Sequence, residues 1–176
     1  MEIVKKPIRL LKNLGIDNII LTNSAGSLRL KNKPGTIMSI NGHYDCTFKI
    51  SLKKPKAIVG NDYYNDYLLS CLNDFEKETN ISIPRGKYCW TTGPGYETPE
   101  EVRYLRKIGG DAVGMSTVPE IQEASLIGMH CLALSVLTNY GSGINNNLLS
   151  HSEVLENANK AKNKLSKILI GLINRI

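Results

Sequence analysis

Apolar residues along the chain fall into two patterns, short unbroken runs and longer stretches with helical spacing. A short apolar run bounded by turn residues is typical of a strand buried on both faces of a sheet. Such runs predict strands in five segments: "DNIILT" (17–22), "GTIMSINGH" (35–43), "GKYCW" (86–90), "DAVGM" (111–115) and "HCLALSVLTN" (130–139). We expect a small, hydroxyl-rich loop over 22–27 and a Gly-Pro-Gly loop after the third strand.

Apolar residues three and four positions apart predict helices between these strands. The helical stretches are 5–14, 62–78 and a long C-terminal segment from Val154 to Leu172. Three further signals match the capping box, in which a Ser or Thr hydroxyl accepts from a free backbone N–H and a Glu reaches back to another. They are Thr98–Glu101, Thr117–Glu120 and Ser150–Glu153. Residues 46–60 are basic and irregular, and we predict a loop there.

Strands alternate with helices throughout, which predicts an α/β layered fold with a largely parallel sheet. In such sheets the ligand crevice lies at the carboxyl ends of the strands. Four predicted strand ends carry polar residues: Asn23-Ser24, Tyr96-Glu97, Met115-Ser116 and Thr138-Asn139. Their agreement in type and position predicts a ligand site at this edge of the sheet.

Each of these residues also has an ordinary structural explanation when it is taken singly. The loop of Ser24, Ala25 and Gly26 either offers a hydroxyl and N–H groups to an anion or forms a plain turn. Glu97 either accepts from a ligand N–H or favours the N-terminus of the next helix. The remaining alternatives are core packing for Met115, helix capping for Ser116 or Thr117, a turn for Asn139 and a solvent-facing position for His151.

Composition narrows the class of protein. A chain of 176 residues is long enough for one domain with its own core, which we expect over 1–176. No apolar run approaches the length of a membrane span and the start has no apolar signal region, so we expect a cytoplasmic protein without a membrane partner. The 4 cysteines are scattered, which favours free thiols over a metal site. The net charge is +6, but no dense basic block argues for nucleic acid.

The segment "GPGYETPEEVRYLRKIGGDAVGMSTVPE" (93–120) closely resembles the signature region of the trimeric purine nucleoside phosphorylases. The stretches "LTNSAGSL", "KPGTIMSINGH", "SVLTN" and "SHSEVLENA" resemble further segments of the family in the same order. The resemblance implies a phosphorylase/hydrolase-like, three-layer α/β/α fold with a mixed, largely parallel sheet, and a homotrimer. It also implies reversible phosphorolysis of inosine, guanosine or their deoxy counterparts to free base and (deoxy)ribose 1-phosphate, with inorganic phosphate as co-substrate and no cofactor.

The resemblance further assigns roles to individual residues. Asn139 would donate to N7 and O6 of the purine, and Glu97 would accept from N1–H and from the 2-amino group of guanine. Adenine lacks the N1–H donor, so it would leave the carboxylate unpaired. Related methylthioadenosine phosphorylases typically carry Asp where this chain has Asn139, which favours 6-oxopurines. The other implied contacts are Tyr96 and Met115 with the ribose, Val113 with the base, Thr138 with Asn139, His151 with the ribose 5′-hydroxyl, and Ser24 and Ser116 with phosphate.

The chain also departs from the family pattern. Family members are longer at the amino end, and the segment without a counterpart here carries a Gly-Ser-rich phosphate loop and an Arg/His-containing stretch. We therefore expect an N-terminally truncated fold with an open sheet edge. Gly42 stands where the family commonly has Asp. Three hypotheses follow. The first is a phosphorylase chain, acting alone or with a separately encoded N-terminal fragment. The second is a catalytically impaired homologue that only binds nucleosides or assembles with partner chains, and the third is an unrelated nucleotide-binding domain.

Overall fold

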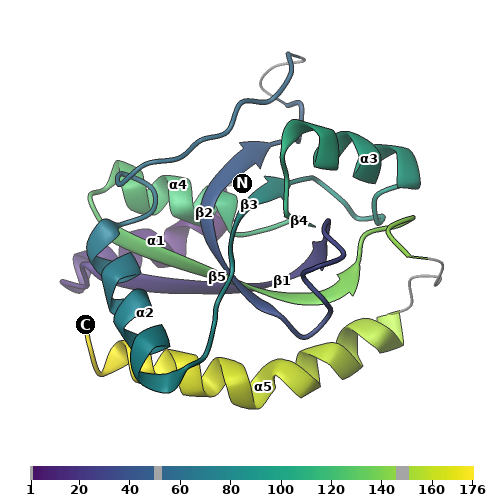
Figure 1. The fold of residues 1–176 in the computed structure, drawn as a ribbon. Coiled ribbons are helices and arrows are strands. Elements are labelled where there is room, and N and C mark those ends of the chain that lie inside the picture. The colour runs from purple at the N-terminus through teal and green to yellow at the C-terminus, as the bar shows by residue number, and fades with distance from the viewer. Residues whose placement is uncertain (1, 50–52, 146–150) are drawn as a thin grey trace.

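A computed structural model describes residues 2–49, 53–145 and 151–176, apart from the side chains of His151 and Glu153. Strands and helices alternate along most of the described chain (Figure 1). The strands are β1 (Asn18–Ser27), β2 (Ile37–Asp45), β3 (Arg85–Trp90), β4 (Ala112–Gly114) and β5 (His130–Tyr140). The helices are α1 (Glu2–Asn13), α2 (Asp66–Thr79), α3 (Pro99–Ile108), α4 (Val118–Leu126) and α5 (His151–Ile173).

The strands form one mixed sheet in the order β1-β4-β3-β2-β5, and β5 returns to β1 so that the sheet closes into a barrel. The pairs β1–β5, β2–β3 and β3–β4 are parallel, whereas β1–β4 and β2–β5 are antiparallel. This confirms the mixed, largely parallel sheet. Closure rests on Gly26 and Ser27, which pair with β4, while the described partners of residues 18–25 are all on β5. The expected open edge is present along this part of β1.

Helices cover both sides of the sheet, as the three-layer expectation requires. Helices α1 and α4 pack on one side through a core that includes Ile8 and Ile121. Helices α2 and α5 pack on the other through a core that includes Phe75 and Ile168. Figure 1 shows α2 and α5 on the side of the sheet opposite α1 and α4, with α3 near the carboxyl ends of β3 and β4. Burial of these apolar stripes is the main force that holds the layers together.

Two sequence predictions about element boundaries are wrong. The strand β1 continues through the predicted loop, because residues 22–27 stay paired with β5 from Thr22 beside Leu134 to Ser27 beside Tyr140. The helix α2 begins at Asp66 instead of 62, because the Asn65 side chain accepts from the backbone N–H of Leu68 and caps it there. The capping box at Thr98 and Glu101 is confirmed. The one predicted over 150–153 lies outside the described side chains.

The loop that follows β2 folds back over that strand. The backbone N–H of His43 donates to the carbonyl of Ile58 at 2.9 Å, and the reverse bond measures 2.8 Å. A Cβ at Gly42 would lie 2.7 Å from Cγ1 of Val59, so glycine at this position permits the close approach of the loop.

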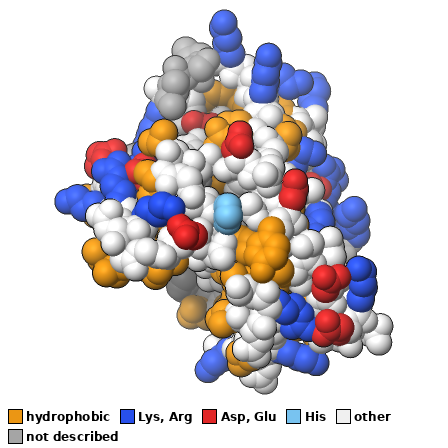
Figure 2. Space-filling model, turned by 90° about the vertical axis from the view of Figure 1, so that its left-hand side faces the viewer, with side chains coloured by type: hydrophobic (Ala, Val, Ile, Leu, Met, Phe, Trp, Pro, Cys, Tyr) orange, Lys and Arg blue, Asp and Glu red, His pale blue; other side chains and the backbone are white. Residues whose placement is uncertain are grey.

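The face of the molecule shown in Figure 2 agrees with the expectation of dispersed charge. Figure 2 shows Lys and Arg side chains at separate places around one face, among acidic and hydrophobic ones. The four cysteines are free, as predicted, and the structure shows that all four are buried. Among the helices of the described ranges, none has the length and apolarity needed to cross a membrane.

Candidate functional site

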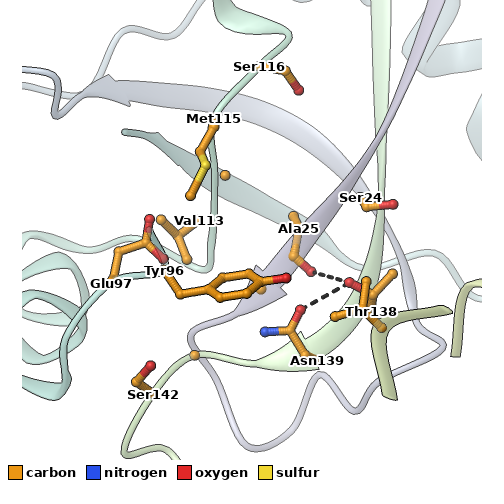
Figure 3. Close-up of a pocket in the computed structure, with 14 residues that line it drawn as sticks. Ser24, Ala25, Tyr96, Glu97, Val113, Met115, Ser116, Thr138, Asn139 and Ser142 are labelled. Atoms are coloured by element: carbon orange, nitrogen blue, oxygen red, sulfur yellow. Dashed lines mark hydrogen bonds between the residues drawn. The ribbon is translucent and has the colours of Figure 1, made fainter. Parts of the chain in front are cut away.

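A cavity of about 230 Å³ lies at the carboxyl ends of β1, β4 and β5 and beside the loop after β3. It brings together every residue to which the family resemblance assigned a ligand contact and whose side chain is described (Figure 3). Asn23, also named at a strand end, is not among the lining residues. The lining residues are Ser24, Ala25, Gly26, Tyr96, Glu97, Val113, Gly114, Met115, Ser116, Thr138, Asn139, Gly141, Ser142 and Val154. The predicted site residue His151 has its backbone at the start of α5, but its side chain lies outside the described residues.

Asn139 is held in one orientation at the end of β5. The Thr138 hydroxyl donates to Oδ1 of Asn139 at 3.0 Å, and Nδ2 of Asn139 donates to the carbonyl of Tyr140 at 2.9 Å. An amide nitrogen carries two hydrogens, so one N–H remains for a ligand. Gly26 permits this packing, because a Cβ there would lie 3.3 Å from Nδ2. The Thr138 contact is the one that the sequence assigned.

Glu97 is positioned by a residue that the sequence analysis missed. The Thr91 hydroxyl, just beyond the end of β3, donates to Oε1 of Glu97 at 2.7 Å. The Glu97 side chain is half-buried and lines the cavity. An ionised carboxylate accepts up to about four hydrogen bonds and donates none. The remaining capacity of Glu97 therefore selects a ligand that presents an N–H or O–H.

Apolar side chains form walls between the polar groups. Tyr96 and Met115 are 51% and 37% exposed and are free to contact a ligand, whereas Val113 is 3% exposed and contributes a packed surface. Figure 3 shows the Tyr96 ring extending into the cavity from the loop that also carries Glu97. Gly93, at φ 62°, lies against Met115, and a side chain there would overlap the Met115 sulfur. Met115 and Tyr96 are therefore available to a ligand, whereas the alternative for Met115 was core packing alone.

The end of β4 has an unusual backbone that the sequence analysis did not anticipate. The N–H of Val118 donates to the carbonyl of Ser116 at 2.9 Å and closes a γ-turn centred on Thr117, at φ 74° and ψ −38°. A β-branched residue in this region is strained by about 1–3 kcal/mol. The Thr117 side chain makes no capping bond to α4, so the prediction that it caps this helix is wrong.

The Thr117 hydroxyl has other partners instead. Nδ2 of Asn23, on β1, donates to Oγ1 of Thr117 at 2.9 Å, and Oγ1 lies 3.1 Å from Oγ of Ser116. The N–H of Ser116 also donates to the Tyr88 hydroxyl at 3.5 Å. Burial raises the pKa of Tyr88 to about 12, so this hydroxyl stays protonated near neutral pH. Ser116 itself remains exposed to the cavity.

The residues at or beside the site that went unnoticed in the sequence as contributors include Thr91, Tyr88, Ser142 and Val154. Thr91 directly follows a predicted strand and carries a hydroxyl, which is the same signal that marked the other strand ends. Ser142 and Val154 carry no comparable signal, because they reach the cavity through the packing of the segments after β5. Among the described residues, no group of three or more His, Cys, Asp or Glu is arranged to hold a metal ion.

The fold and this cavity define an α/β protein whose ligand site combines one carboxylate, one amide and several hydroxyls at the strand ends. The sequence profile described as "Phosphorylase superfamily" matches residues 2–174. The chain therefore belongs to the phosphorylase superfamily, and the resemblance identified from its motifs is confirmed at this level.

Named relatives agree with this assignment. The chain is 39% identical to purine nucleoside phosphorylase 1 of Bacillus subtilis, over 98% of this chain and 66% of the relative. It is 35% identical to a probable S-methyl-5′-thioinosine phosphorylase of Methanocaldococcus jannaschii, over 93% and 67% of the two chains. A crystal structure of Schistosoma purine nucleoside phosphorylase with hypoxanthine superimposes with a TM-score of 0.84 at 26% identity, covering 97% of this chain and 66% of that one. The chain thus spans about two thirds of the length of these relatives.

Proposed function

We propose that this chain carries the nucleoside-binding half of a purine nucleoside phosphorylase, which converts inosine, guanosine or their deoxy counterparts to free base and (deoxy)ribose 1-phosphate. The observation that carries the proposal is the shared cavity of Glu97 and Asn139, each fixed by a neighbouring hydroxyl. Inorganic phosphate is the co-substrate, and no cofactor takes part. The names of the relatives support this reading.

The two fixed side chains match the edge of a 6-oxopurine. Glu97 accepts from N1–H, and from the 2-amino group where the base is guanine. The remaining N–H of Asn139 donates to N7 or O6. Adenine presents an acceptor at N1 and an amino donor at C6, so it meets like groups at both residues. The site therefore favours hypoxanthine and guanine over adenine.

The chemistry follows from the same contacts. A phosphate oxygen attacks C1′ of the ribose, a C1′–O bond forms, and the C1′–N9 bond breaks. The electron pair of the broken bond moves onto the purine, where the Asn139 N–H stabilises the growing negative charge. Met115 and Tyr96 hold the sugar between the base and the anion, Val113 packs on the base, and His151 contacts the 5′-hydroxyl. The hydroxyls of Ser24 and Ser116 hold the phosphate.

The partners of this chain are part of the same proposal. We place the protein in the cytoplasm as a homotrimer that binds neither nucleic acid nor membrane. A separately encoded fragment would supply the Gly-Ser-rich loop and the Arg/His stretch that the family resemblance implies. The stretch of β1 over 18–25 supports such a fragment, because its described strand partner lies on one side only. A strand from a second chain would complete the backbone hydrogen bonds there.

Base selectivity tests this function directly. We expect hypoxanthine and guanine, but not adenine, to raise the melting temperature of the purified chain. At about one hundred times the dissociation constant, a ligand adds about 2.7 kcal/mol, or roughly 5–10 °C for a chain of this size. Glu97→Gln should weaken hypoxanthine binding about tenfold, because it replaces a charged acceptor with a neutral one. Glu100→Gln, which changes an exposed carboxylate on α3, is the matched control.

Inosine phosphorolysis then separates the two family hypotheses. Hypoxanthine release above the Glu97→Gln background assigns catalysis to this chain unaided. Base binding without release indicates the impaired homologue, or the need for the N-terminal fragment, and adding that segment of the Bacillus subtilis relative distinguishes these two. Equal stabilisation by adenine and hypoxanthine would refute the roles of Glu97 and Asn139.

A further inference from the structure

The γ-turn at Thr117 places a strained residue beside the anion end of the cavity without giving it a helix cap. A glycine would adopt the same φ of 74° with no steric cost. The threonine side chain is 4% exposed, so it makes no direct contact with bulk water. Strain of this kind persists where the surrounding contacts require the residue. The contacts of the Thr117 hydroxyl with Asn23 and Ser116 therefore need an explanation.

The bond from Asn23 sets the acceptor role of the Thr117 hydroxyl and leaves its proton free for a second partner. Asn23 Nδ2 can only donate, so Oγ1 of Thr117 accepts from it at 2.9 Å. The single proton of the Thr117 hydroxyl is then available to Ser116, whose Oγ lies 3.1 Å away. When Thr117 donates, Ser116 accepts that proton and keeps its own proton for a third group. Since Ser116 is exposed to the cavity, a ligand bound there can accept this proton.

We infer that Asn23 and Thr117 are positioning residues that direct the Ser116 hydroxyl proton at the anion in the cavity. This inference rests on the proposed function, in which Ser116 holds phosphate. An ionised phosphate oxygen carries no proton, so it only accepts hydrogen bonds. A Ser116 oxygen that presented a lone pair would therefore repel this phosphate oxygen. The row of hydrogen bonds from Asn23 through Thr117 to Ser116 prevents that orientation of the Ser116 hydroxyl. Hydrogen bonds in such a chain also polarise one another, which strengthens the last donor.

The orientation of the Asn23 amide decides this direction. Oδ1 of Asn23 is buried and has no hydrogen-bond partner among the residues that the structure describes. If the amide were turned over, Oδ1 would take the Thr117 proton, and Ser116 would then have to donate to Thr117. The lone pairs of Ser116 would then face the anion. The site thus leaves one buried acceptor unpaired in the arrangement that serves anion binding.

The test compares phosphate binding with base binding in the full chain. Inorganic phosphate is titrated while the amide NMR signal of Ser116 is followed, and hypoxanthine is titrated separately. Thr117→Val keeps the branched shape and removes the hydroxyl, whereas Thr117→Ser keeps the hydroxyl. Asn23→Asp replaces the donor with an acceptor and reverses the direction of these hydrogen bonds. Thr22→Val is the matched control, because Thr22 is an exposed residue of the same strand.

We expect Thr117→Val and Asn23→Asp to weaken phosphate binding about tenfold, in line with a lost bond to a charged group, and to leave hypoxanthine affinity unchanged. Thr117→Ser should restore phosphate affinity, and Thr22→Val should have no effect. Thr117→Gly provides a second criterion. It should weaken phosphate binding without lowering the melting temperature, because glycine relieves the strain at φ 74°. A purely structural role for the hydroxyl would lower stability and both affinities together.

Several results would overturn the inference: unchanged phosphate affinity in Thr117→Val, equal losses for phosphate and hypoxanthine, or no phosphate-induced shift at Ser116 in the unsubstituted chain. Failure of the proposed function gives a different result. In that case the unsubstituted chain does not bind hypoxanthine, while the phosphate series still decides the role of Thr117.

Discussion

Protonation of His43 should make the stability of this protein sensitive to mild acid. The ring lies at the end of β2 with none of its surface exposed. Its Nδ1 is 2.6 Å from the Tyr64 hydroxyl, and Nε2 has no hydrogen-bond partner among the described residues. Burial lowers the pKa of His43 to about 4, against a smaller opposite effect of the Asp45 carboxylate. The folded protein therefore keeps this ring neutral at pH values where the unfolded chain protonates it.

The size of the effect follows from the two pKa values. Below the ordinary pKa of 6.5 the unfolded chain binds a proton that the folded protein does not, so the free energy of unfolding falls as the pH falls. The loss ends near the folded pKa of about 4. At about 1.4 kcal/mol for each pH unit, the full loss is about 3 kcal/mol. About 2 kcal/mol of it is reached by pH 5, which corresponds to roughly 4–8 °C in melting temperature.

Melting temperatures between pH 7.5 and 5 measure this loss. His43→Gln keeps a polar partner for Tyr64 but has no proton to gain, so its melting temperature should change much less over the same range. His130→Gln, which removes an exposed imidazole, is the matched control. Equal slopes for the unsubstituted chain and His43→Gln would refute the assignment of this pH dependence to His43.

Two further substitutions test the site. Asn139→Asp should reduce the preference for hypoxanthine over adenine about tenfold, because a carboxylate accepts from a 6-amino group and no longer donates to O6. Calorimetric titration with both bases measures this preference. Asn174→Asp, at an exposed position, is the control. Gly114→Ala should lower the free energy of unfolding by about 1–3 kcal/mol, because the added methyl group overlaps the Tyr88 hydroxyl. Gly95→Ala is its control, since a Cβ there meets nothing within 4 Å, and equal denaturation midpoints for the two variants would contradict the packing argument.

The sequence determined the elements and the location of the site. Apolar runs and helical spacing are local patterns, and they predicted all five described strands and the alternation with helices. Polar residues at strand ends predicted which side chains meet, because the topology of a largely parallel sheet brings those ends together. Glu97 and Asn139 line one cavity for this reason, although they lie on segments far apart in the chain.

Only the tertiary structure decided how those side chains are oriented. The strand β1 extends through Ser27 because β5 pairs with it, and local hydroxyls and glycine had predicted a loop. The helix-capping motif at Thr117 fails because its hydroxyl bonds to Asn23, 94 positions earlier. Likewise, the orientation of the Asn139 amide depends on Thr138 and on the Tyr140 carbonyl. Short-range patterns set the backbone elements, whereas a polar side chain takes the best donor or acceptor that folding brings near it, and that partner is not written in its local sequence.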